Sequence, residues 1–351
     1  MLTRDFDYHL PATAIAQHPA PRGHSRLLVL DAAGEERHRQ PVDLPSILRP
    51  GDLLVVNDTR VLRARIFGRR RPGGGRMELL LAEKQPAGDG DGDGDGECWD
   101  VLAKPGKRAR PGTQIDFDDG LAAEVVAKGP GGRVRIRFSR PVEPHLQRFG
   151  HVPLPPYLKR PDERADHTDY QTIFARNPGA IAAPTAGLHF TPELVADLAG
   201  HGIGCAAITL HVGLGTFKPV TAELVHEHHM EAERYLVPEA AAAAIRRTRH
   251  GGGSIVAVGT TVVRTLETAA AGDGEVAAGE GRTKLYVTPG FRFRAVDVLL
   301  TNFHLPRSTL LMLVSAFAGR ERVLAAYEEA IANGYRFYSY GDAMLAERRP
   351  D

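Results

Sequence analysis

The sequence lacks the compositional features that would point directly to a function. Its 351 residues include only two cysteines, Cys98 and Cys205, which match neither a disulfide framework nor a zinc-ligand spacing. Lys plus Arg number 44 and Asp plus Glu number 43, so the formal charge of +1 gives no overall field that would attract a polyanion. A nucleic acid would therefore have to bind a local basic patch.

Long apolar runs are also absent. No window approaches the roughly 20 apolar residues of a transmembrane helix, and residues 1–10 carry charges where a signal peptide needs an apolar core. With so few cysteines, these absences lead us to expect a cytoplasmic protein without a membrane partner. The 42% hydrophobic content is enough for a sizeable core, and the length favours two domains or one large domain with an insertion.

Several motifs that mark cofactor or metal sites are incomplete. Gly213-Leu-Gly215 begins like a dinucleotide fingerprint, but Lys218 stands where the third glycine belongs. His226-Glu227-His228-His229 lacks the second histidine of a metalloprotease motif, because Met230 occupies that position. The sequence has no phosphate-loop or Gly-x-Ser-x-Gly motif and indicates no metal requirement. The acidic residues at 86–97 alternate with glycine and are more typical of a disordered loop than of a calcium site.

The predicted elements divide the chain into two kinds of sequence. Residues 61–150 contain short alternating runs separated by Gly and Pro, a pattern typical of a small antiparallel β-barrel. Residues 1–60 and 151–351 alternate strands with helices, which indicates an α/β catalytic domain interrupted by the β-barrel domain. Because no dinucleotide signature is present, we expect this α/β domain to be barrel-like rather than an open nucleotide-binding sheet.

Polar and small residues follow five of the predicted strands. In residues 179–217, two short apolar runs joined by a helix end beside His189 and His211, which predicts a parallel crossover unit. Ligands bind at the carboxyl ends of parallel strands, so we expect the five clusters to line one pocket. Each cluster taken alone is more typical of a capped turn. The clusters are residues 57–60, 185–189, 211–216, 260–264 and 302–304.

The predicted β-barrel is rich in cations. The period of two in a strand places Arg133, Arg135 and Arg137 on one face, with apolar side chains on the other. A solvated sheet face explains these arginines alone. Further basic residues in the same segment favour a surface that binds RNA phosphates: Arg69, Arg70, Arg71, Lys104, Lys107, Arg108 and Arg110.

The strand-end clusters also resemble a known family. The S-adenosylmethionine:tRNA ribosyltransferase-isomerases of queuosine biosynthesis have segments similar to Ala183-Pro-Thr-Ala-Gly-Leu-His-Phe190, Leu210-His-Val-Gly-Leu-Gly-Thr-Phe217, Val258-Gly-Thr-Thr261 with Arg264, and Thr301-Asn-Phe-His-Leu-Pro306. The similarity covers nearly the whole chain outside the Asp/Gly tract. Val262, Glu231 and Lys218 depart from the family pattern, which commonly has Ser, His and Gln at these positions.

The resemblance implies a specific reaction. The ribosyl part of S-adenosylmethionine is transferred to the 7-aminomethyl-7-deazaguanine at the wobble position of tRNA and isomerised to give epoxyqueuosine, while adenine and methionine leave. S-adenosylmethionine would be a co-substrate, no prosthetic group would be needed, and the protein would act as a monomer. The resemblance also implies a barrel-like α/β catalytic domain with an inserted β-barrel domain.

This chemistry needs a base for the ribose proton beside the sulfonium and an acid for the departing adenine. Histidine suits both tasks because its pKa lies near neutral pH. We predict His189 and His211 as base and acid in either order, with His304 as a third candidate; the alternative for each is a histidine that only orders a turn. Glu231 and Glu233 could instead act as the general base or recognise the substrate amines, with a solvated helical face as the alternative, and His229 is a further candidate for recognising the deazaguanine or its amine.

The remaining candidates would bind substrates. Arg264 or the turn before it is predicted to bind the methionine carboxylate. Further candidates for S-adenosylmethionine, base or ribose contacts are Asn57, Asp58, Arg60, Thr185, Gly187, Gly213, Gly215, Thr216, Thr260, Thr261 and Asn302. The predicted tRNA contacts are Arg133, Arg135, Arg137, Tyr157, Lys159 and Arg160. Two rival interpretations are an enzyme acting on a free nucleoside or sugar with a purely structural insert, and a non-enzymatic RNA-binding protein.

Overall fold

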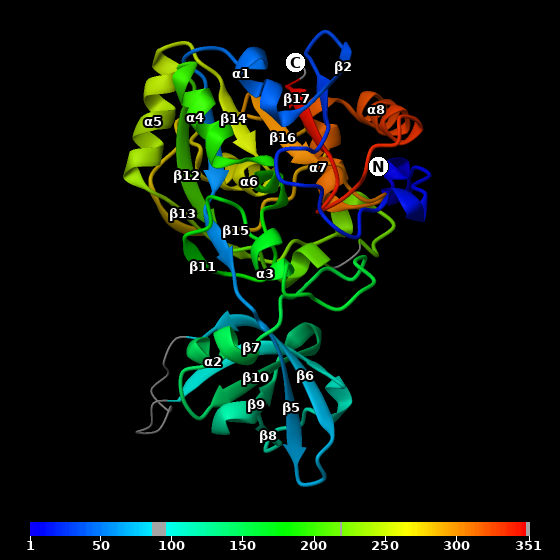
Figure 1. Ribbon diagram of the computed structural model, residues 1–351, viewed down its shortest axis with the longest axis vertical. Helices are drawn as coiled ribbons and strands as arrows, with labels where there is room; N and C mark the ends of the chain where they lie inside the picture. The colour runs from blue at the N-terminus through cyan, green and yellow to red at the C-terminus, as the bar shows by residue number, and fades with distance from the viewer. Residues whose placement is uncertain (86–95, 218–219, 349–351) are drawn as a thin grey trace.

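The computed structural model describes residues 1–85, 96–217 and 220–348. It consists of two bodies, an α/β body that contains both termini and a smaller β-barrel (Figure 1). Two chain segments connect the two bodies. The segments lie side by side, because Arg65 and His151 form an antiparallel bridge between them. All strands of the barrel lie between Arg65 and Phe138, inside the range in which the sequence predicts an insert.

The α/β body is built on one nine-stranded sheet of order β15-β13-β12-β3-β14-β16-β17-β1-β2. Strands β12, β3, β14 and β16 run parallel at its centre. Their residues are almost all apolar because helices cover both faces. In the order of the sheet, the strands are β15 (Gly279–Thr283), β13 (Glu233–Val237), β12 (Gly204–Leu210), β3 (Leu53–Asn57), β14 (Ile255–Val258), β16 (Val298–Asn302), β17 (Ala343–Glu347), β1 (Leu27–Leu30) and β2 (Glu36–Arg39).

The α/β class is confirmed, but the expected barrel-like form of this sheet is not what the structure has. The strand order begins at β15 and ends at β2, and within the described residues these two edge strands do not pair with each other. Antiparallel strands border the parallel centre on both sides, through the β12–β13 and β16–β17 pairs. A barrel of repeated parallel βα units would need parallel pairs all the way around. The antiparallel pairs interrupt this arrangement on both sides of the parallel centre.

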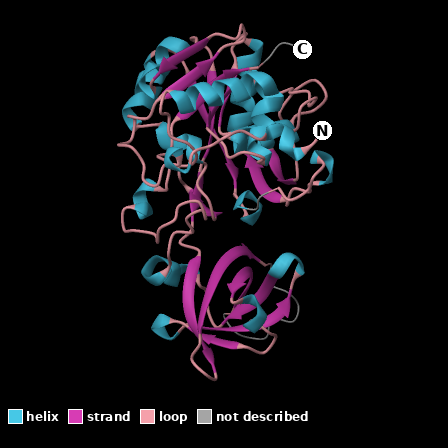
Figure 2. Ribbon diagram, turned by 90° about the vertical axis from the view of Figure 1, so that its right-hand side faces the viewer, coloured by secondary structure: helices cyan, strands magenta, loops and turns pink. Residues whose placement is uncertain are grey.

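Alternation along β3 shows how the sheet creates two cores. Leu53 and Val55 pack into one apolar cluster with helices α5 (Glu239–His250), α6 (Thr260–Ala269), α7 (Thr309–Ala318) and α8 (Arg320–Ala332). Leu54 and Val56 point to the other face and pack with α1 (Leu44–Ile47) and α4 (Pro192–Gly200). Figure 2 shows helices packed around the strands of the α/β body. Thr191 and Ser308 are the N-caps of α4 and α7, because they accept hydrogen bonds from the backbone N–H groups of Leu194 and Leu311.

The insert is a closed six-stranded antiparallel barrel, as the sequence predicts. On β10 the apolar residues Val134, Ile136 and Phe138 are buried, and the arginines between them lie outside. The strands are β5 (Arg65–Arg71), β6 (Arg76–Lys84), β7 (Glu97–Lys104), β8 (Gln114–Asp116), β9 (Ala122–Lys128) and β10 (Arg133–Phe138), followed by helix α2 (Glu143–Phe149).

The loop expected at 86–97 is shorter than predicted. Residues 86–95 lie outside the described residues, but Glu97 begins β7. Its carboxylate is buried and accepts hydrogen bonds from Trp99 Nε1 at 2.9 Å and from the Val142 backbone N–H at 2.7 Å. These two donors, one of them distant in sequence, make a buried carboxylate favourable at the start of a strand.

The prediction of a parallel crossover unit before His211 is wrong, because its two strands belong to different sheets. Strand β11 (Asn177–Ala180) pairs in parallel with β4 (Thr59–Val61) in a separate two-stranded sheet, whereas β12 joins β3. Pro184 then interrupts the apolar run, and His189 lies in a 3₁₀ turn over Thr185–His189. A short helix, α3 (Asp166–Asp169), precedes this region.

Neither a membrane-spanning helix nor a metal cluster is found in the described part of the chain. No helix there combines the length and apolar character needed to cross a bilayer. The same residues contain no group of three or more His, Cys, Asp or Glu side chains arranged to bind a metal ion.

Candidate active site

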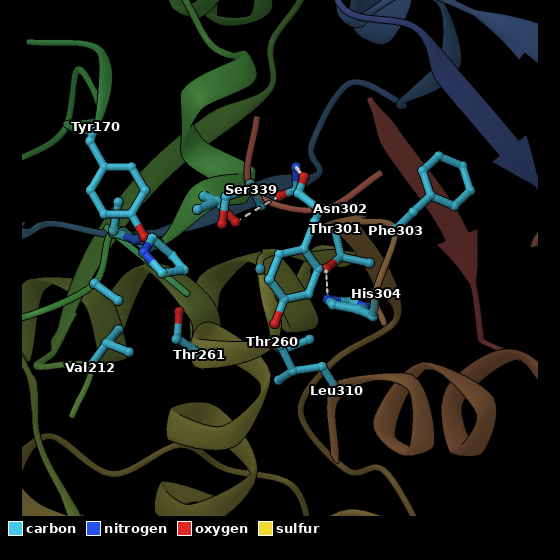
Figure 3. A pocket seen from close by; sticks show the side chains of 18 of the residues that line it. Tyr170, Val212, Thr260, Thr261, Thr301, Asn302, Phe303, His304, Leu310 and Ser339 are labelled. Atoms are coloured by element: carbon cyan, nitrogen blue, oxygen red, sulfur yellow. Dashed lines mark hydrogen bonds between the residues drawn. The ribbon is translucent and has the colours of Figure 1, made fainter. Parts of the chain in front are cut away.

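A cavity lies where several segments of the α/β body meet. Figure 3 shows Tyr170 and Val212 at one end of it, His304 and Leu310 at the other, and Thr261 between them. The structure therefore brings together three of the predicted clusters, at Thr185, at Thr260 to Arg264 and at Asn302 to His304, with Val212 from a fourth.

The N-terminus of α6 forms one wall of this cavity. Gly259 precedes the helix with a φ of +97°, a conformation that favours glycine, and directs the chain into Thr260 and Thr261. The first N–H groups of a helix have no partner within it and carry partial positive charge. This wall can therefore bind an anionic group.

Arg264, one turn further along α6, adds a full positive charge. Its side chain is buried, donates from Nε to the Leu285 carbonyl at 3.0 Å and forms an ion pair with Glu233 through Nη1. Within the described residues, its Nη2 is buried without a hydrogen-bond acceptor. Because buried polar groups are rarely left unpaired, this nitrogen is available for a ligand carboxylate.

His189 lies behind the cavity wall and is held by protein groups on both ring nitrogens. Asn302 Nδ2 donates to the Tyr338 carbonyl, which fixes the orientation of that amide, and Nδ2 lies 3.1 Å from His189 Nε2. The imidazole proton is therefore on Nδ1, which donates to Ser25 Oγ at 2.7 Å. Burial lowers the pKa of His189 to about 4. The ring is neutral at pH 7, and its contacts fit a positioning role rather than proton transfer.

His304 lines the cavity and is held by Tyr327. The His304 backbone N–H donates to Tyr327 Oη at 3.2 Å, so the hydroxyl proton of Tyr327 is directed at His304 Nδ1, 3.3 Å away. This places the imidazole proton on Nε2, which faces Thr301 Oγ1 at 3.4 Å. Burial lowers the pKa of His304 to about 3. His304 can thus donate a hydrogen bond toward the cavity but does not serve as a base through Nε2.

His211 differs from the other two histidines. Thr59 Oγ1 lies 2.9 Å from His211 Nδ1, and its contact with the Asn177 carbonyl is long, at 3.5 Å. Among the described residues, Nε2 has no hydrogen-bond partner, and its lone pair is free when Nδ1 carries the proton. Burial and the nearby Arg234 lower the pKa of His211, against an opposing effect of Asp58. A half-buried neutral imidazole with a free basic nitrogen is the arrangement of a general base.

The ring of His211 is packed against Gly179. A Cβ atom at position 179 would lie 2.7 Å from the ring, and the φ of +153° at Gly179 also favours glycine. Gly179 is the first residue of the stretch 179–217, but its sequence neighbours alone do not mark it as part of the site.

A second cavity, an open cleft, lies between the two bodies. His211, Gly213, Glu231 and Glu233 line it from the α/β body, and barrel residues, including Trp99, line the opposite side. The bodies are joined here by an ion pair between Arg133 and Glu231 and by one between Arg282 Nη1 and Glu83 at 2.7 Å. Val212 lines the first cavity and this cleft, so the two lie next to each other.

Three predicted binding residues lie near Thr59, and they contact other protein groups or solvent. Asn57 bonds to the backbone of Leu210 through both side-chain atoms and to Thr261 Oγ1 at 3.2 Å. Asp58 accepts from Thr209 Oγ1 at 2.6 Å and from Asn177. These bonds tie β3 and β12 together, which agrees with the alternative of a capped turn. Arg60 is exposed and lines neither cavity.

Of the predicted glycine and threonine contacts, Thr185 lines the first cavity and Gly213 the second, whereas Gly187 and Gly215 line neither. The Gly213 N–H donates to Glu233 Oε1 at 2.8 Å, and Gly215 lies beside Glu231. Gly187 is buried against Thr172, where a Cβ atom would come within 2.8 Å. Thr185 donates to Asn302 Oδ1 at 3.0 Å and orients that amide. The side chain of Thr216 lies outside the described part of the structure.

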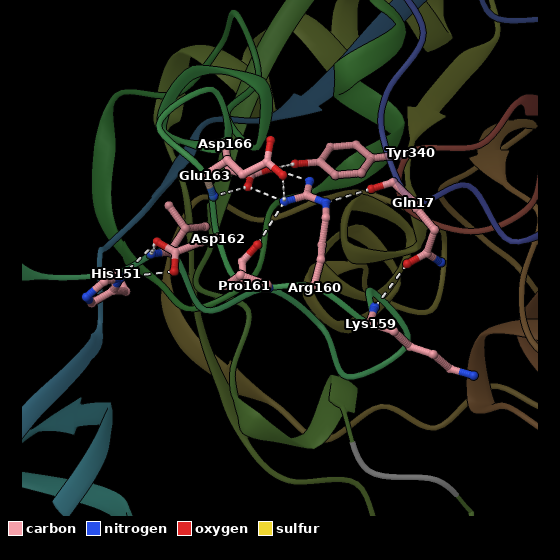
Figure 4. A network of polar contacts seen from close by, with 10 residues as sticks. Gln17, His151, Lys159, Arg160, Pro161, Asp162, Glu163, Asp166 and Tyr340 are labelled. Carbon is pink, nitrogen blue, oxygen red and sulfur yellow. Dashed lines mark hydrogen bonds and ion pairs between the residues drawn. The ribbon is translucent and has the colours of Figure 1, made fainter. Parts of the chain in front are cut away.

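Most of the predicted RNA contacts are engaged within the protein. Arg135 pairs with Asp100 at 2.9 Å, and Arg137 also has an interaction partner. Arg160 makes a bidentate ion pair with the buried Asp166, at 2.6 and 2.7 Å, and Lys159 extends into solvent (Figure 4). Tyr157 lines the first cavity and hydrogen-bonds to Ser339. His229 is exposed, contacts the Glu227 carbonyl at 2.8 Å and lines neither cavity.

Aromatic residues that the sequence pattern did not reveal complete the first cavity. Tyr170, Tyr338 and Ser339 line it, and burial raises the pKa of Tyr338 to about 12. Tyr338 has a φ of +74°, unusual for a non-glycine residue, and its N–H donates to the Phe303 carbonyl at 3.0 Å. Apart from the family similarity around residues 335–342, no local pattern marks these positions as a site.

The fold and the cavity together define an α/β protein with an inserted β-barrel and a cavity that is bordered by the N-terminus of α6 and by Arg264. Residues 3–346 match the family described as "Queuosine biosynthesis protein". The chain belongs to this family.

Individual relatives support the same conclusion. The chain is 54% identical over 348 residues to the S-adenosylmethionine:tRNA ribosyltransferase-isomerase of Gloeobacter violaceus, a match that covers 98% of this chain and 95% of the relative. It is 52% identical to the protein of that name from Moorella thermoacetica, over 98% of this chain and 99% of the relative. The crystal structure of an S-adenosylmethionine tRNA ribosyltransferase from Thermotoga maritima is similar, with a TM-score of 0.54 and 38% identity over 97% of this chain and 99% of that one.

Proposed function

We propose that this chain is an S-adenosylmethionine:tRNA ribosyltransferase-isomerase of queuosine biosynthesis. It transfers the ribosyl group of S-adenosylmethionine to the 7-aminomethyl-7-deazaguanine of tRNA, isomerises it to give epoxyqueuosine, and releases adenine and methionine. The carrying observation is Arg264 Nη2, a buried cationic donor without an acceptor in the described structure, beside the N-terminus of α6 in the wall of the first cavity.

S-adenosylmethionine would bind in this first cavity. Its methionine carboxylate meets Arg264 and the N–H groups at Thr260 and Thr261, which supply charge-assisted hydrogen bonds. Tyr170 and Tyr338 offer aromatic surfaces for the adenine ring. No prosthetic group takes part, and S-adenosylmethionine is consumed as a co-substrate.

The geometry supports different roles for the three histidines. His211, with Nε2 unprotonated, removes the acidic proton from the ribose carbon next to the sulfonium. His304, with its proton on Nε2, donates a hydrogen bond that stabilises the departing adenine. His189 touches Asn302 and Ser25 and acts as a positioning residue. Glu233 holds Arg264 and the Gly213 N–H, so it also positions the site.

The β-barrel supplies the tRNA surface in this proposal. Residues 61–150 form the inserted domain, residues 1–60 and 151–351 form the catalytic domain, and the enzyme acts as a monomer in the cytoplasm. Lys104, Lys107, Arg108 and Arg110 are exposed and, within the described residues, have no ion-pair partner, unlike the paired arginines of β10. These loop cations are the better candidates for phosphate contacts.

One observation favours a second candidate function. Arg133 and Arg135 are paired within the protein, as expected if the insert is only structural and the enzyme acts on a free nucleoside or sugar. A single experiment separates the two functions. Purified protein is incubated with S-adenosylmethionine alone, with tRNA carrying the aminomethyl-deazaguanine, and with the free aminomethyl-deazaguanine nucleoside.

The proposed function predicts adenine release and a mass increase on the nucleoside only with the modified tRNA. Turnover of the free nucleoside at an equal rate would favour the second candidate. No adenine release in any mixture would contradict both.

A further inference from the structure

The cleft between the two bodies contains two carboxylates with different surroundings. Glu233 and its partner Arg264 each have a side chain only 6% exposed, and Glu233 also accepts from the Gly213 N–H. Glu231 is 30% exposed, and its partner Arg133 comes from the β-barrel and is 25% exposed. The first pair is fixed inside the α/β body, whereas the second joins the two bodies at the edge of an open cleft.

This difference makes only the second pair exchangeable. Separating a buried pair leaves an uncompensated charge in a medium of low polarity, which is strongly unfavourable. A half-hydrated pair contributes little net stability, because water screens the charges and solvates them once they separate. Arg133 can therefore leave Glu231 when both side chains find other charged partners.

The same cleft has the features needed for the acceptor base. His211 lines it, Trp99 provides an aromatic wall, and Val212 connects it to the first cavity. The acceptor is a flat heterocycle that carries a primary aminomethyl group, which is cationic near neutral pH. A carboxylate beside the general base is the group that recognises such a cation.

We propose that the cleft between the bodies is the acceptor-base site and that Glu231 binds the aminomethyl group of the base. This inference rests on the proposed function and names the specificity residue for its second substrate. When the RNA arrives, Arg133 exchanges its carboxylate partner for a backbone phosphate, and Glu231 takes the aminomethyl cation in its place. An RNA with ordinary guanine at the same position offers a phosphate for Arg133 but no aminomethyl cation for Glu231.

The test compares two otherwise identical tRNAs, one with aminomethyl-deazaguanine and one with guanine at the wobble position. Dissociation constants are measured by equilibrium binding for the wild type and for Glu231→Gln, which keeps the shape of the side chain and removes its charge. The wild type should prefer the aminomethyl tRNA, and E231Q should lose roughly 10- to 100-fold of that preference, the usual range for a hydrogen bond to a charged group. The KM for S-adenosylmethionine should not change.

Two further variants make the result specific. Asp100→Asn removes a carboxylate that pairs with Arg135 outside the cleft, and the preference should stay at the wild-type value. Arg133→Ala should weaken binding of both tRNAs by the same factor and keep the preference. Thermal unfolding of each variant confirms that it is folded.

Two results would overturn the inference: an E231Q protein that still prefers the aminomethyl tRNA as the wild type does, or an R133A protein that loses the preference. Neither result contradicts the proposed function if wild-type protein releases adenine with the modified tRNA. Absence of adenine release from the wild type would instead contradict the proposed function itself.

Discussion

Glu233 and Arg264 form a buried ion pair that joins the two cavities of this protein. Arg264 lines the first cavity from α6, and Glu233 lines the cleft from the start of β13. Each also has a backbone partner, Leu285 for Arg264 and Gly213 for Glu233. The position of the Arg264 guanidinium is therefore set by the same strand that borders the cleft.

Replacing Arg264 with lysine should weaken binding of S-adenosylmethionine. Lysine keeps the charge but does not have the planar fork that contacts Glu233, Leu285 and a ligand carboxylate together. We expect the KM for S-adenosylmethionine to rise about tenfold or more, corresponding to roughly 1.5 kcal/mol or more for one missing charge-assisted bond. Initial rates of adenine release over a range of S-adenosylmethionine concentrations measure this. Arg282→Lys, at the interface between the bodies, is the matched control, and an unchanged KM in R264K would argue against the carboxylate site.

Removing the imidazole of His211 should abolish most turnover. His211→Ala eliminates the proposed base, so kcat should fall by a factor of about 10² to 10⁴, the usual contribution of general acid–base catalysis. Single-turnover adenine release measures the effect without interference from product release. His229→Ala, an exposed histidine that lines neither cavity, should keep wild-type activity. Equal losses in the two variants would contradict the assignment.

Ser25 should matter for stability more than for the chemical step. Ser25→Ala removes the acceptor of the buried His189 Nδ1–H and leaves a donor unpaired, which costs about 1–3 kcal/mol. Urea unfolding should show a free energy of unfolding that is lower by this amount. Any decrease in kcat should come only from an Asn302 side chain that is less well positioned. Ser46→Ala, which removes an exposed hydroxyl bonded to Asp43, serves as the control. A stable S25A protein with greatly reduced kcat would instead place His189 in the chemistry.

Stability should depend on pH through His189 and His304. Burial lowers their pKa values from 6.5 to about 4 and about 3, so the unfolded chain binds more protons than the native state below pH 6.5. The free energy of unfolding should therefore be highest above pH 6.5 and decrease as the pH falls toward 4. The decrease should reach about 1.4 kcal/mol per pH unit for each histidine. Denaturant titrations from pH 8 to 4 test this, and His304→Gln should show a smaller slope than the wild type.

The basic loop at the far end of the barrel should bind RNA phosphates. Strand β6 runs from Arg76 at its hairpin to Lys84 at the cleft, and its Glu78 lies opposite Lys104 of β7, so the loop after Lys104 lies away from the α/β body. Changing Lys107, Arg108 and Arg110 together to alanine should weaken tRNA binding. It should also reduce the slope of log K against log salt by about one for each phosphate that the protein no longer neutralises. Arg135→Ala, which breaks an internal pair, should change this slope less. A larger change of slope in R135A than in the triple variant would instead favour the arginine face of β10 as the phosphate-binding surface.

Much of this architecture follows from local pattern. Alternation in residues 133–138 predicted the inner and outer faces of a barrel strand. The cluster pattern correctly predicted that residues near Thr185, Thr260 and Asn302 would meet. Local pattern did not reveal Tyr170 or Tyr338, because a tyrosine that lines a cavity has the same sequence neighbours as one that packs in a core.

The sequence by itself determined the family, the α/β body with its inserted β-barrel, and the segments that form the site, because strand periodicity, helix caps and long motifs are properties of neighbouring residues. Only the tertiary structure decided that the large sheet stays open, that Arg133 pairs across the two bodies, and that His189 and His304 carry their protons on different ring nitrogens. The physical reason is that edge pairing, ion pairing and the pKa of a buried imidazole depend on groups far apart in the chain, and folding alone determines which of these groups come together.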